Sequence, residues 1–414
     1  MHKYFYTKAG CYATNISMSI VGNLSPLLFL TFRDLYGISY TLLGLLILIN
    51  FCTQLTVDLI FSFFSDRFNI PKVVKFTPVI TIFGLIIYML TPFIFKGNEY
   101  LGLAIGTVVF SSASGLCEVL ISPVIAAIPA ENPDREMSKL HSIYAWGVVA
   151  VVIITTLYIK FLGSANWQWL VLIFLCVPLA AAIFFSLSEI PPMDAGENKD
   201  GKNISGLFSK GLIISVICIF LGGAAECTMA QWCSTYIEKG LAFSKLIGDI
   251  FGVALFSAML GLGRSLYAKY GKKIVRVLFA CSFGAFVCYF AAAVSNSAVV
   301  GMFACALTGL CVSMLWPGNL IMMTDKFMCT GVAAFALMAA GGDLGASIGP
   351  QLVGIITDNV MVSKLGADLA AYLSVSPEQA GMKLGMLVGA LFPLVLTLIY
   401  TVIIIKDKKK EKIS

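Results

Sequence analysis

Charged residues are scarce in this sequence of 414 residues. Asp, Glu, Lys and Arg make up 12% of it, whereas apolar residues make up 59%. Soluble globular domains carry about 25% charged and about 45–50% apolar residues. This shortage of charge excludes an ordinary soluble enzyme, and the apolar content excludes a disordered chain. We therefore expect no enzymatic activity.

Metal-binding and redox patterns are also missing. The sequence has 2 histidines, and its 12 cysteines are scattered through apolar runs without a CxxC pair. Secreted disulfide scaffolds and metal sites need paired or regularly spaced ligands. We expect no metal site and no cofactor, apart from Na⁺ or H⁺ as a possible coupling ion.

Long apolar stretches dominate what is present. A membrane-spanning helix needs about 20 apolar residues, and the chain has room for roughly twelve such segments with their loops. No pattern of alternating residues typical of a membrane β-barrel occurs. The sequence therefore predicts an all-α membrane protein with twelve transmembrane helices. The predicted spans are 9–33, 40–63, 73–95, 100–128, 138–161, 166–188, 209–237, 246–267, 275–295, 298–323, 330–357 and 383–405.

Basic residues alternate between the loops on the two sides. With the N-terminus inside, the cytoplasmic segments hold 21 of the 28 Lys and Arg residues. An excess of Lys and Arg marks cytoplasmic loops. This bias accounts for the net charge of +6 without nucleic acid as a partner. We expect a multi-pass protein of the plasma (bacterial inner) membrane, with both termini cytoplasmic and the lipid bilayer as its surroundings.

The chain divides into two similar halves. The longest polar stretch, 188–202, follows the sixth predicted span, and the turn SDRFN at 65–69 is echoed by AKYGK at 268–272. We predict an N-terminal six-helix bundle over 1–188, a cytoplasmic linker over 189–207 and a C-terminal six-helix bundle over 208–414. Two parallel repeats indicate a transporter with a binding site between them near the membrane midplane.

The sequence resembles the major facilitator superfamily over essentially its whole length. The signature after the second helix, G-x-L-x-D-R-x-G-R-K, is matched by Asp66, Arg67 and Lys72, while Ser62 and Asn69 replace glycines. Within it, the fucose-permease-like sugar transporters look most similar. That similarity is carried by CEVLISP at 117–123, ENP at 131–133, LHS at 140–142, GAAE at 223–226, Trp232, Tyr236, Gly263-Arg264, Ser313, Trp316-Pro317, and the helix-11 residues Gly341, Gly342, Leu344, Gly345 and Pro350.

Carboxylates inside the predicted spans indicate a functional or structural role, since a charge at the bilayer centre costs at least about 2.5 kcal/mol. The sequence places Asp58, Glu118, Glu226, Asp249 and Asp343 there. Asp58 and Glu118 lie at similar depths, and Gln54 shares a helix face with Asp58. We predict cation coupling by Asp58, Glu118, Gln54 and Asp343, as a shared proton or a bound sodium ion. The alternative is a purely structural hydrogen-bonding role.

Further polar and aromatic side chains are candidates for binding a solute. A carboxylate accepts hydrogen bonds from two sugar hydroxyls, and an aromatic face suits the C–H face of a sugar ring. Each aromatic and amide residue could equally serve ordinary helix packing. No Lys or Arg falls at mid-membrane, which disfavours anionic substrates. The predicted substrate-binding residues are Glu226, Trp232, Gln231, Tyr236, Trp146, Trp316, Asn319 and Asn23.

The basic turns suggest how transport is gated. Asp66, Arg67, Arg135 and Arg264 are predicted at the cytoplasmic face. The resemblance implies that such charges bridge helices; the alternative is a solvated loop. We interpret the chain as a monomeric symporter that couples a cation to a neutral sugar or sugar-like solute by alternating access. The alternative is a multidrug antiporter that exchanges lipophilic cations for protons, and a receptor without transport is a more distant one.

Overall fold

The computed structural model describes residues 4–64, 67–129, 133–191, 209–271, 273–295, 297–327 and 332–411. Within these ranges every regular element is a helix. The predicted all-α class is therefore confirmed. The helices of the first part of the chain are α1 (Phe5–Leu27), α2 (Phe29–Tyr36), α3 (Tyr40–Phe64), α4 (Ile70–Ile94), α5 (Glu99–Ala127), α6 (Pro133–Leu162) and α7 (Trp167–Ser186).

The second part of the chain is more broken. Two of its turns are π-helical, and several predicted spans consist of two shorter helices. These elements are α8 (Lys210–Thr235), η3 (Tyr236–Gly240), α9 (Lys245–Ile247), η4 (Gly248–Ala254), α10 (Leu255–Tyr270), α11 (Ile274–Val294), α12 (Ala298–Val312), α13 (Pro317–Asp325), α14 (Val332–Val362), α15 (Lys364–Leu373), α16 (Pro377–Gly389) and α17 (Leu391–Glu411).

Each predicted span coincides with one helix or one run of helices. Among the described residues, 9 helices or runs are long and apolar enough to cross a membrane, and 10 are if α1 and α2, bent by 46°, form one span. The total of twelve transmembrane helices therefore stays a prediction from the sequence. The short helix α15, which lies between the last two predicted spans, was not expected from the sequence.

Contacts divide the chain into two compact units. The N-terminal unit comprises Met1–Ile38 and Ile49–Lys199, and the C-terminal unit comprises Ser39–Leu48 and Asp200–Ser414. The helix α3 therefore contributes its first turns to the C-terminal unit and its remainder to the N-terminal unit. The boundaries predicted from the sequence did not include this exchange.

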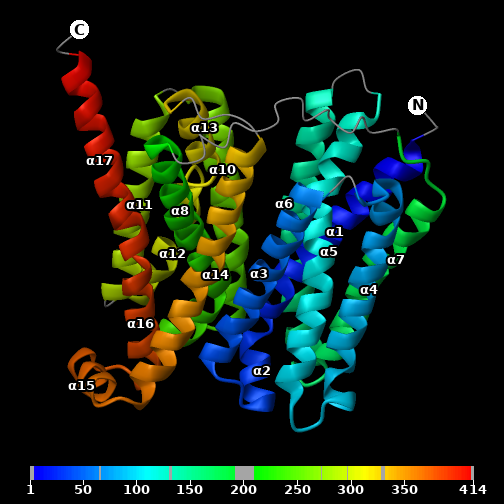
Figure 1. Ribbon diagram of the computed structural model, residues 1–414. Helices are drawn as coiled ribbons and strands as arrows, with labels where there is room; N and C mark the ends of the chain where they lie inside the picture. The colour runs from blue at the N-terminus through cyan, green and yellow to red at the C-terminus, as the bar shows by residue number, and fades with distance from the viewer. Residues whose placement is uncertain are drawn as a thin grey trace. The chain divides into compact units, whose positions relative to one another are not determined.

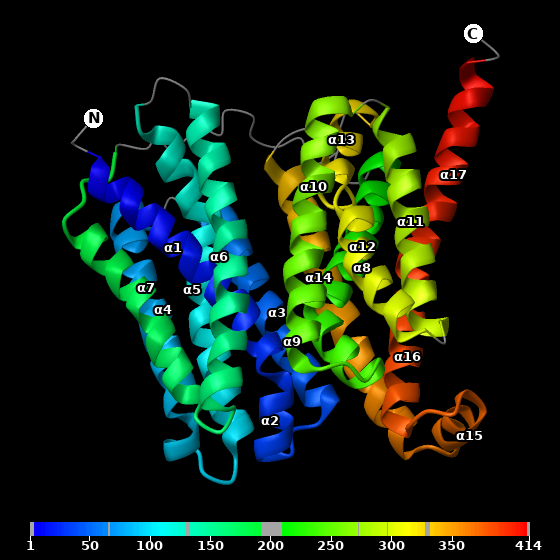
Figure 2. The ribbon, with the colours of Figure 1, turned by 180° about the vertical axis from the view of Figure 1, so that it is seen from behind.

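The N-terminal unit is built on α1, α4, α5, α6 and α7, which lie side by side in Figure 2. Its aromatic core joins Phe32, Tyr88 and Trp167, whose ring centroids lie 5.0 to 5.9 Å apart. The Trp167 indole also donates a hydrogen bond of 2.9 Å to the Tyr36 hydroxyl. Trp167 thus packs inside the unit, because its polar N–H finds a hydrogen-bond partner there.

The C-terminal unit is centred on α8 and α14, which pack along each other in Figure 1. Glycines make the close approach possible. A Cβ atom at Gly223 would lie 2.5 Å from the carbonyl oxygen of Gly342, and one at Gly349 would lie 2.8 Å from that of Ala224. Small residues at helix contacts allow backbones to touch within a membrane.

The first turns of α3 dock onto α14. The Asp358 carboxylate of α14 accepts hydrogen bonds from the backbone N–H groups of Tyr40 (3.1 Å) and Thr41 (2.6 Å). The Tyr40 hydroxyl donates to Glu378 at 2.8 Å, and its ring lies 5.8 Å from that of Trp232. Asp358 therefore acts as an N-terminal cap for α3 that is supplied by another helix.

Removal of this cap should destabilise the C-terminal unit. We expect Asp358→Ala to lower the free energy of unfolding by about 1 kcal/mol, the usual cost of losing an N-terminal cap. A thermal-unfolding midpoint in detergent measures the change. The control is Asn359→Ala, since that exposed amide donates to the Ile355 carbonyl of its own helix and caps no other helix among the described residues. Equal midpoints for the two variants would contradict the capping role.

Candidate functional site

A break in a predicted span marks the candidate site of the C-terminal unit. Ala298–Asp325 is apolar enough to be one span, yet α12 ends at Val312 and α13 begins at Pro317. Pro317 has no backbone N–H, so the helix cannot continue through it with its normal bonds. Discontinuous helices in transporters typically line a binding site, where freed backbone groups need other partners.

Arg264 of α10 binds this break. A Cβ atom at the preceding Gly263 would lie 2.7 Å from the Ser313 Cβ, so glycine is what lets α10 approach the end of α12. The Arg264 Nε then donates to the Ser313 carbonyl oxygen at 3.2 Å. Its Nη2 donates to Glu226 Oε1 of α8 at 3.1 Å. One guanidinium thus joins three elements of the unit.

The second oxygen of Glu226 is the most distinctive atom of the site. Glu226 Oε2 is buried and has no hydrogen-bond partner among the described residues. The side chain of Glu226 is 13% exposed and that of Arg264 is 46% exposed, so the pair is open on the arginine side. Because a buried acceptor without a donor is costly, this oxygen is suited to a ligand's donor group.

Trp316 and Asp343 lie beside this pair. The Trp316 ring packs against two glycines, with a Cβ atom at Gly342 only 2.6 Å and one at Gly223 3.1 Å from ring carbons. Asp343 follows Gly342 directly and is buried. Glu226, Arg264, Trp316 and Asp343 therefore belong to one neighbourhood of the C-terminal unit, which we call the α8–α14 site.

Three other predicted substrate-binding residues make hydrogen bonds to protein atoms within the C-terminal unit. Trp232 is buried, and its indole N–H donates to the Pro350 carbonyl at 2.9 Å. The buried Tyr236 hydroxyl donates to the Ala292 carbonyl at 2.6 Å. Asn319 donates to the Leu315 carbonyl and accepts from the Tyr400 hydroxyl. These three side chains favour the packing interpretation, since their polar atoms already have protein partners.

The remaining predicted ligands are not brought together. Trp146 of α6 is 73% exposed. The Asn23 amide donates to the Ser19 carbonyl within α1 at 2.9 Å. Gln231 is half-buried on α8, five residues beyond Glu226 and therefore on a different face of the helix. Of the predicted substrate-binding set, Glu226 and Trp316 are the two that share the α8–α14 site.

Three of the four predicted coupling residues lie on neighbouring helices, Gln54 and Asp58 on α3 and Glu118 on α5, whereas Asp343 lies on α14. Ser111 of α5 donates to the Asn50 amide oxygen of α3 at 2.6 Å. A Cβ atom at Gly115 would lie 3.0 Å from the Gln54 carbonyl oxygen and 3.2 Å from Asp58 Oδ1. Glu118 follows Gly115 by almost one turn and is exposed. Asp58 and Glu118 therefore lie at similar heights, as their positions in the sequence suggested.

The structure does not bring the predicted gating residues together in one cluster. Asp66 and the Arg135 side chain lie outside the described residues, and the exposed Arg67 lies 5.1 Å from the centroid of the Phe64 ring. Arg264 was predicted at the cytoplasmic turn. It lies instead inside α10 and reaches Glu226, because the long side chain extends beyond its own turn. The Arg264 guanidinium therefore lies beside Glu226, a predicted substrate-binding residue. The expected lack of Lys and Arg near the site, which disfavoured anionic substrates, is thus not found.

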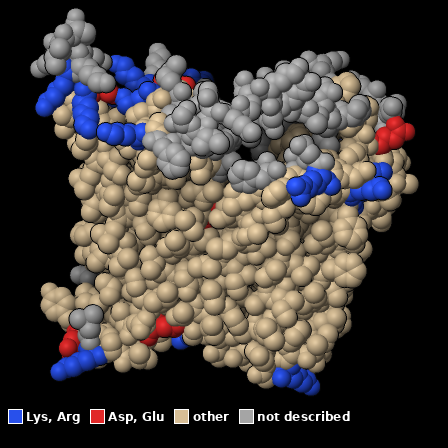
Figure 3. All heavy atoms as spheres, viewed as in Figure 1, with Lys and Arg blue, Asp and Glu red and all other residues tan. Residues whose placement is uncertain are grey.

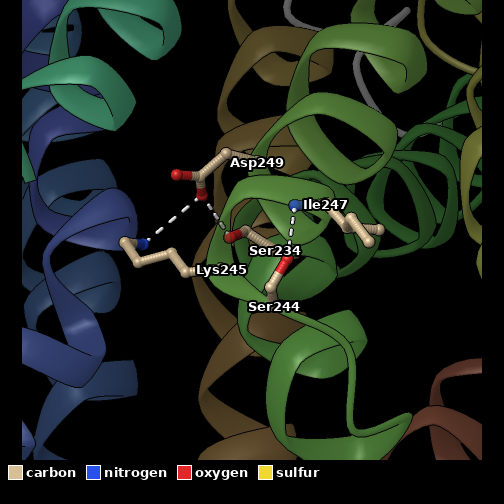
Figure 4. A network of polar contacts seen from close by, with 5 residues as sticks. All are labelled: Ser234, Ser244, Lys245, Ile247 and Asp249. Carbon is tan, nitrogen blue, oxygen red and sulfur yellow. Dashed lines mark hydrogen bonds and ion pairs between the residues drawn. The ribbon is translucent and has the colours of Figure 1, made fainter. Parts of the chain in front are cut away.

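Asp249 was another carboxylate expected within a span. It is fully buried in η4, where it accepts hydrogen bonds from Ser234 Oγ (2.5 Å) and Lys245 Nζ (3.4 Å). Figure 4 shows both donors pointing at the carboxylate. It also shows Ser244, whose hydroxyl oxygen accepts a hydrogen bond from the Ile247 N–H and caps the start of α9. This network fastens the π-helical turn to α8, so we interpret Asp249 as structural.

Comparison with solved structures gives the same fold at low identity. The D-xylose–proton symporter superposes with a TM-score of 0.70 and 14% identity, covering 94% of this chain and 95% of its own. A point mutant of the nucleoside transporter NupG gives 0.72 and 11%, covering 96% and 98%. The Escherichia coli fucose–proton symporter FucP gives 0.61 and 13%, covering 97% and 99%.

Two comparisons of the sequence itself give different results. A search among curated proteins finds no match. The family model described as Major Facilitator Superfamily, by contrast, matches residues 10–350. Its match covers most of the described helices, from α1 into α14. With this match and the shared fold, the chain belongs to the major facilitator superfamily, whose members are transporters that carry small-molecule solutes across membranes.

Proposed function

We propose that the chain is a secondary active transporter that couples a cation, sodium or proton, to the symport of a neutral sugar or sugar-like solute. The observation that carries the proposal is the buried Oε2 of Glu226, which has no partner among the described residues and lies near Trp316 and the break between α12 and α13. The proposed location is the plasma (bacterial inner) membrane with both termini cytoplasmic, as the loop charges predict.

The chemistry of the α8–α14 site fits a polyol. A sugar hydroxyl donates to Glu226 Oε2, while Arg264 holds the other carboxylate oxygen in place. The Trp316 ring offers an apolar face for the C–H face of a sugar ring. Arg264 also compensates the carboxylate charge, so a lipophilic cation gains less here than a neutral solute does. This compensation favours sugar symport over multidrug antiport.

The coupling ion is assigned to the N-terminal unit. Asp58 and Glu118 lie at similar heights, and Gln54 precedes Asp58 by one turn on α3. Two carboxylates at one site share a proton, or a sodium ion neutralises both. Either ion supplies about 2.3 kcal/mol per charge for each 100 mV of membrane potential. Asp343 is a further candidate because it borders the α8–α14 site.

Loss of the Glu226 carboxylate should weaken solute binding. A hydrogen bond to a charged group contributes about 1.5–3 kcal/mol, so Glu226→Ala should raise the dissociation constant of the sugar roughly ten- to a hundredfold. Calorimetry with the purified transporter measures it. Asp325→Asn, an exposed carboxylate at the end of α13, serves as the control. Unchanged affinity in Glu226→Ala would move the binding site elsewhere.

A further inference from the structure

We propose that the C-terminal unit binds one anionic phospholipid in a groove between α8 and α17, with the lipid phosphate at the end of the unit that carries the C-terminus. The groove has a volume of about 640 Å³. The residues that line it include Ile217 of α8, Lys326 after α13, and Leu398, Val402, Lys406 and Asp407 of α17. We refer to it below as the α8–α17 groove.

The walls of the groove are apolar and face outward. Ile217 of α8 and Leu398 and Val402 of α17 are each about half exposed. From Leu398 to Lys406 the α17 wall rises roughly 12 Å, and one leaflet provides roughly 15 Å of hydrocarbon. The groove therefore matches the length of an acyl chain within a single leaflet.

The charges gather at one end of both walls. On α8, Lys210 precedes Ile214 by one turn, and on α17 Lys406 follows Val402 by one turn, with Lys409 on the same side. Figure 3 shows blue lysine and arginine atoms at the end of the unit where α17 ends. Basic pockets between membrane helices near the surface suit anionic lipid headgroups.

One lysine of the groove is already paired. Lys326 Nζ contacts both carboxylate oxygens of Asp407 at 2.6 Å. This ion pair joins the end of α13 to α17 at the charged end of the groove. Lys406 also lines the groove, and within the described part of the chain it has no hydrogen bond or ion pair. The lysines at the mouth thus outnumber its one lining carboxylate, and a phosphate complements the excess.

A second copy of the chain fits the groove less well. A two-fold contact at this surface would place the same lysines opposite one another. Like charges brought together in this way repel, whereas a phospholipid fills the apolar walls and neutralises the lysines at once. The charge pattern therefore favours the lipid.

The test uses the purified full-length transporter in a neutral detergent. Phosphatidylglycerol and phosphatidylcholine with identical acyl chains are added, and lipid retention is measured by native mass spectrometry. We expect retention of phosphatidylglycerol over phosphatidylcholine. Each of Lys406→Gln and Lys409→Gln should weaken phosphatidylglycerol binding about fivefold, the typical effect of one lysine near an anionic surface.

Two controls make the result decisive. Lys408→Gln removes a charge from the opposite side of α17 and should leave phosphatidylglycerol retention unchanged. Val402→Ser keeps every lysine but should also reduce retention, because it makes the acyl-chain wall polar. Equal retention of the two lipids would overturn the proposal. So would equal losses in Lys406→Gln and Lys408→Gln, or full competition by inorganic phosphate, which would indicate a site for the phosphate alone.

Discussion

Arg264→Ala is expected to abolish sugar transport and to lower the stability of the C-terminal unit. The variant removes the donor to the Ser313 carbonyl and the partner of Glu226 together. Removing one member of a buried ion pair costs about 3–5 kcal/mol. Because the Arg264 side chain is 46% exposed, solvent screening reduces this cost, and we expect about 2 kcal/mol. Transport assays and thermal unfolding in detergent measure the two effects.

A second substitution distinguishes the ion pair from a general packing defect. Arg264→Ala leaves the Glu226 carboxylate buried without its cation, whereas adding Glu226→Gln removes that charge as well. The double variant should therefore be more stable than Arg264→Ala alone, although it should not transport. Arg264→Lys should retain part of the stability, since an ammonium cannot bind both partners in the fixed geometry of a guanidinium. A double variant less stable than the single one would argue against the ion pair.

Glu118→Gln is expected to uncouple transport from the ion gradient. A symporter that moves one charge with a neutral solute can concentrate the solute about 50-fold at 100 mV. If Glu118 carries the coupling ion, the amide mimics the permanently neutral form, and the accumulation ratio should fall to about one. Exchange of labelled for unlabelled sugar should continue, because it needs no net ion movement.

The matched control for Glu118 lies on the same helix. Glu99 is in the first turn of α5, where its carboxylate accepts from the Gly97 N–H at 3.0 Å. Glu99→Gln should leave the accumulation ratio unchanged. If Glu118→Gln still concentrates the sugar, coupling must depend on another group, for which Asp58 and Asp343 are the remaining candidates.

The sequence predicted where helices lie better than it predicted what their side chains contact. The sixth span, expected at 166–188, is α7 at Trp167–Ser186, because apolar length alone defines such a segment. The short α15 escaped prediction since its ten residues cannot span a bilayer. The exchange of Ser39–Leu48 between units depends on tertiary contacts such as Asp358 with Tyr40, which leave no local pattern.

The composition of the candidate site was only partly predictable. Glu226 and Trp316 were expected, and the Gly263-Arg264 and Trp316-Pro317 pairs were visible in the sequence. The contact of Arg264 with both Glu226 and the break before Pro317 was not predictable. It depends on how α10 is rotated about its axis and on where the helix breaks, and the sequence shows neither. The same uncertainty explains Trp232 and Tyr236: residue type does not reveal whether a helix turns an aromatic side chain toward a solute or into the core.

Uptake into proteoliposomes distinguishes a cation-coupled sugar symporter from a multidrug antiporter. The purified transporter is reconstituted, and accumulation of radiolabelled neutral sugars is followed under an imposed sodium gradient or an imposed pH gradient. We expect one of these gradients to drive the accumulation of at least one sugar above equilibrium, and Glu118→Gln to abolish this accumulation while sugar exchange persists. Export of lipophilic cations in exchange for protons, with no sugar accumulated under either gradient, would contradict it.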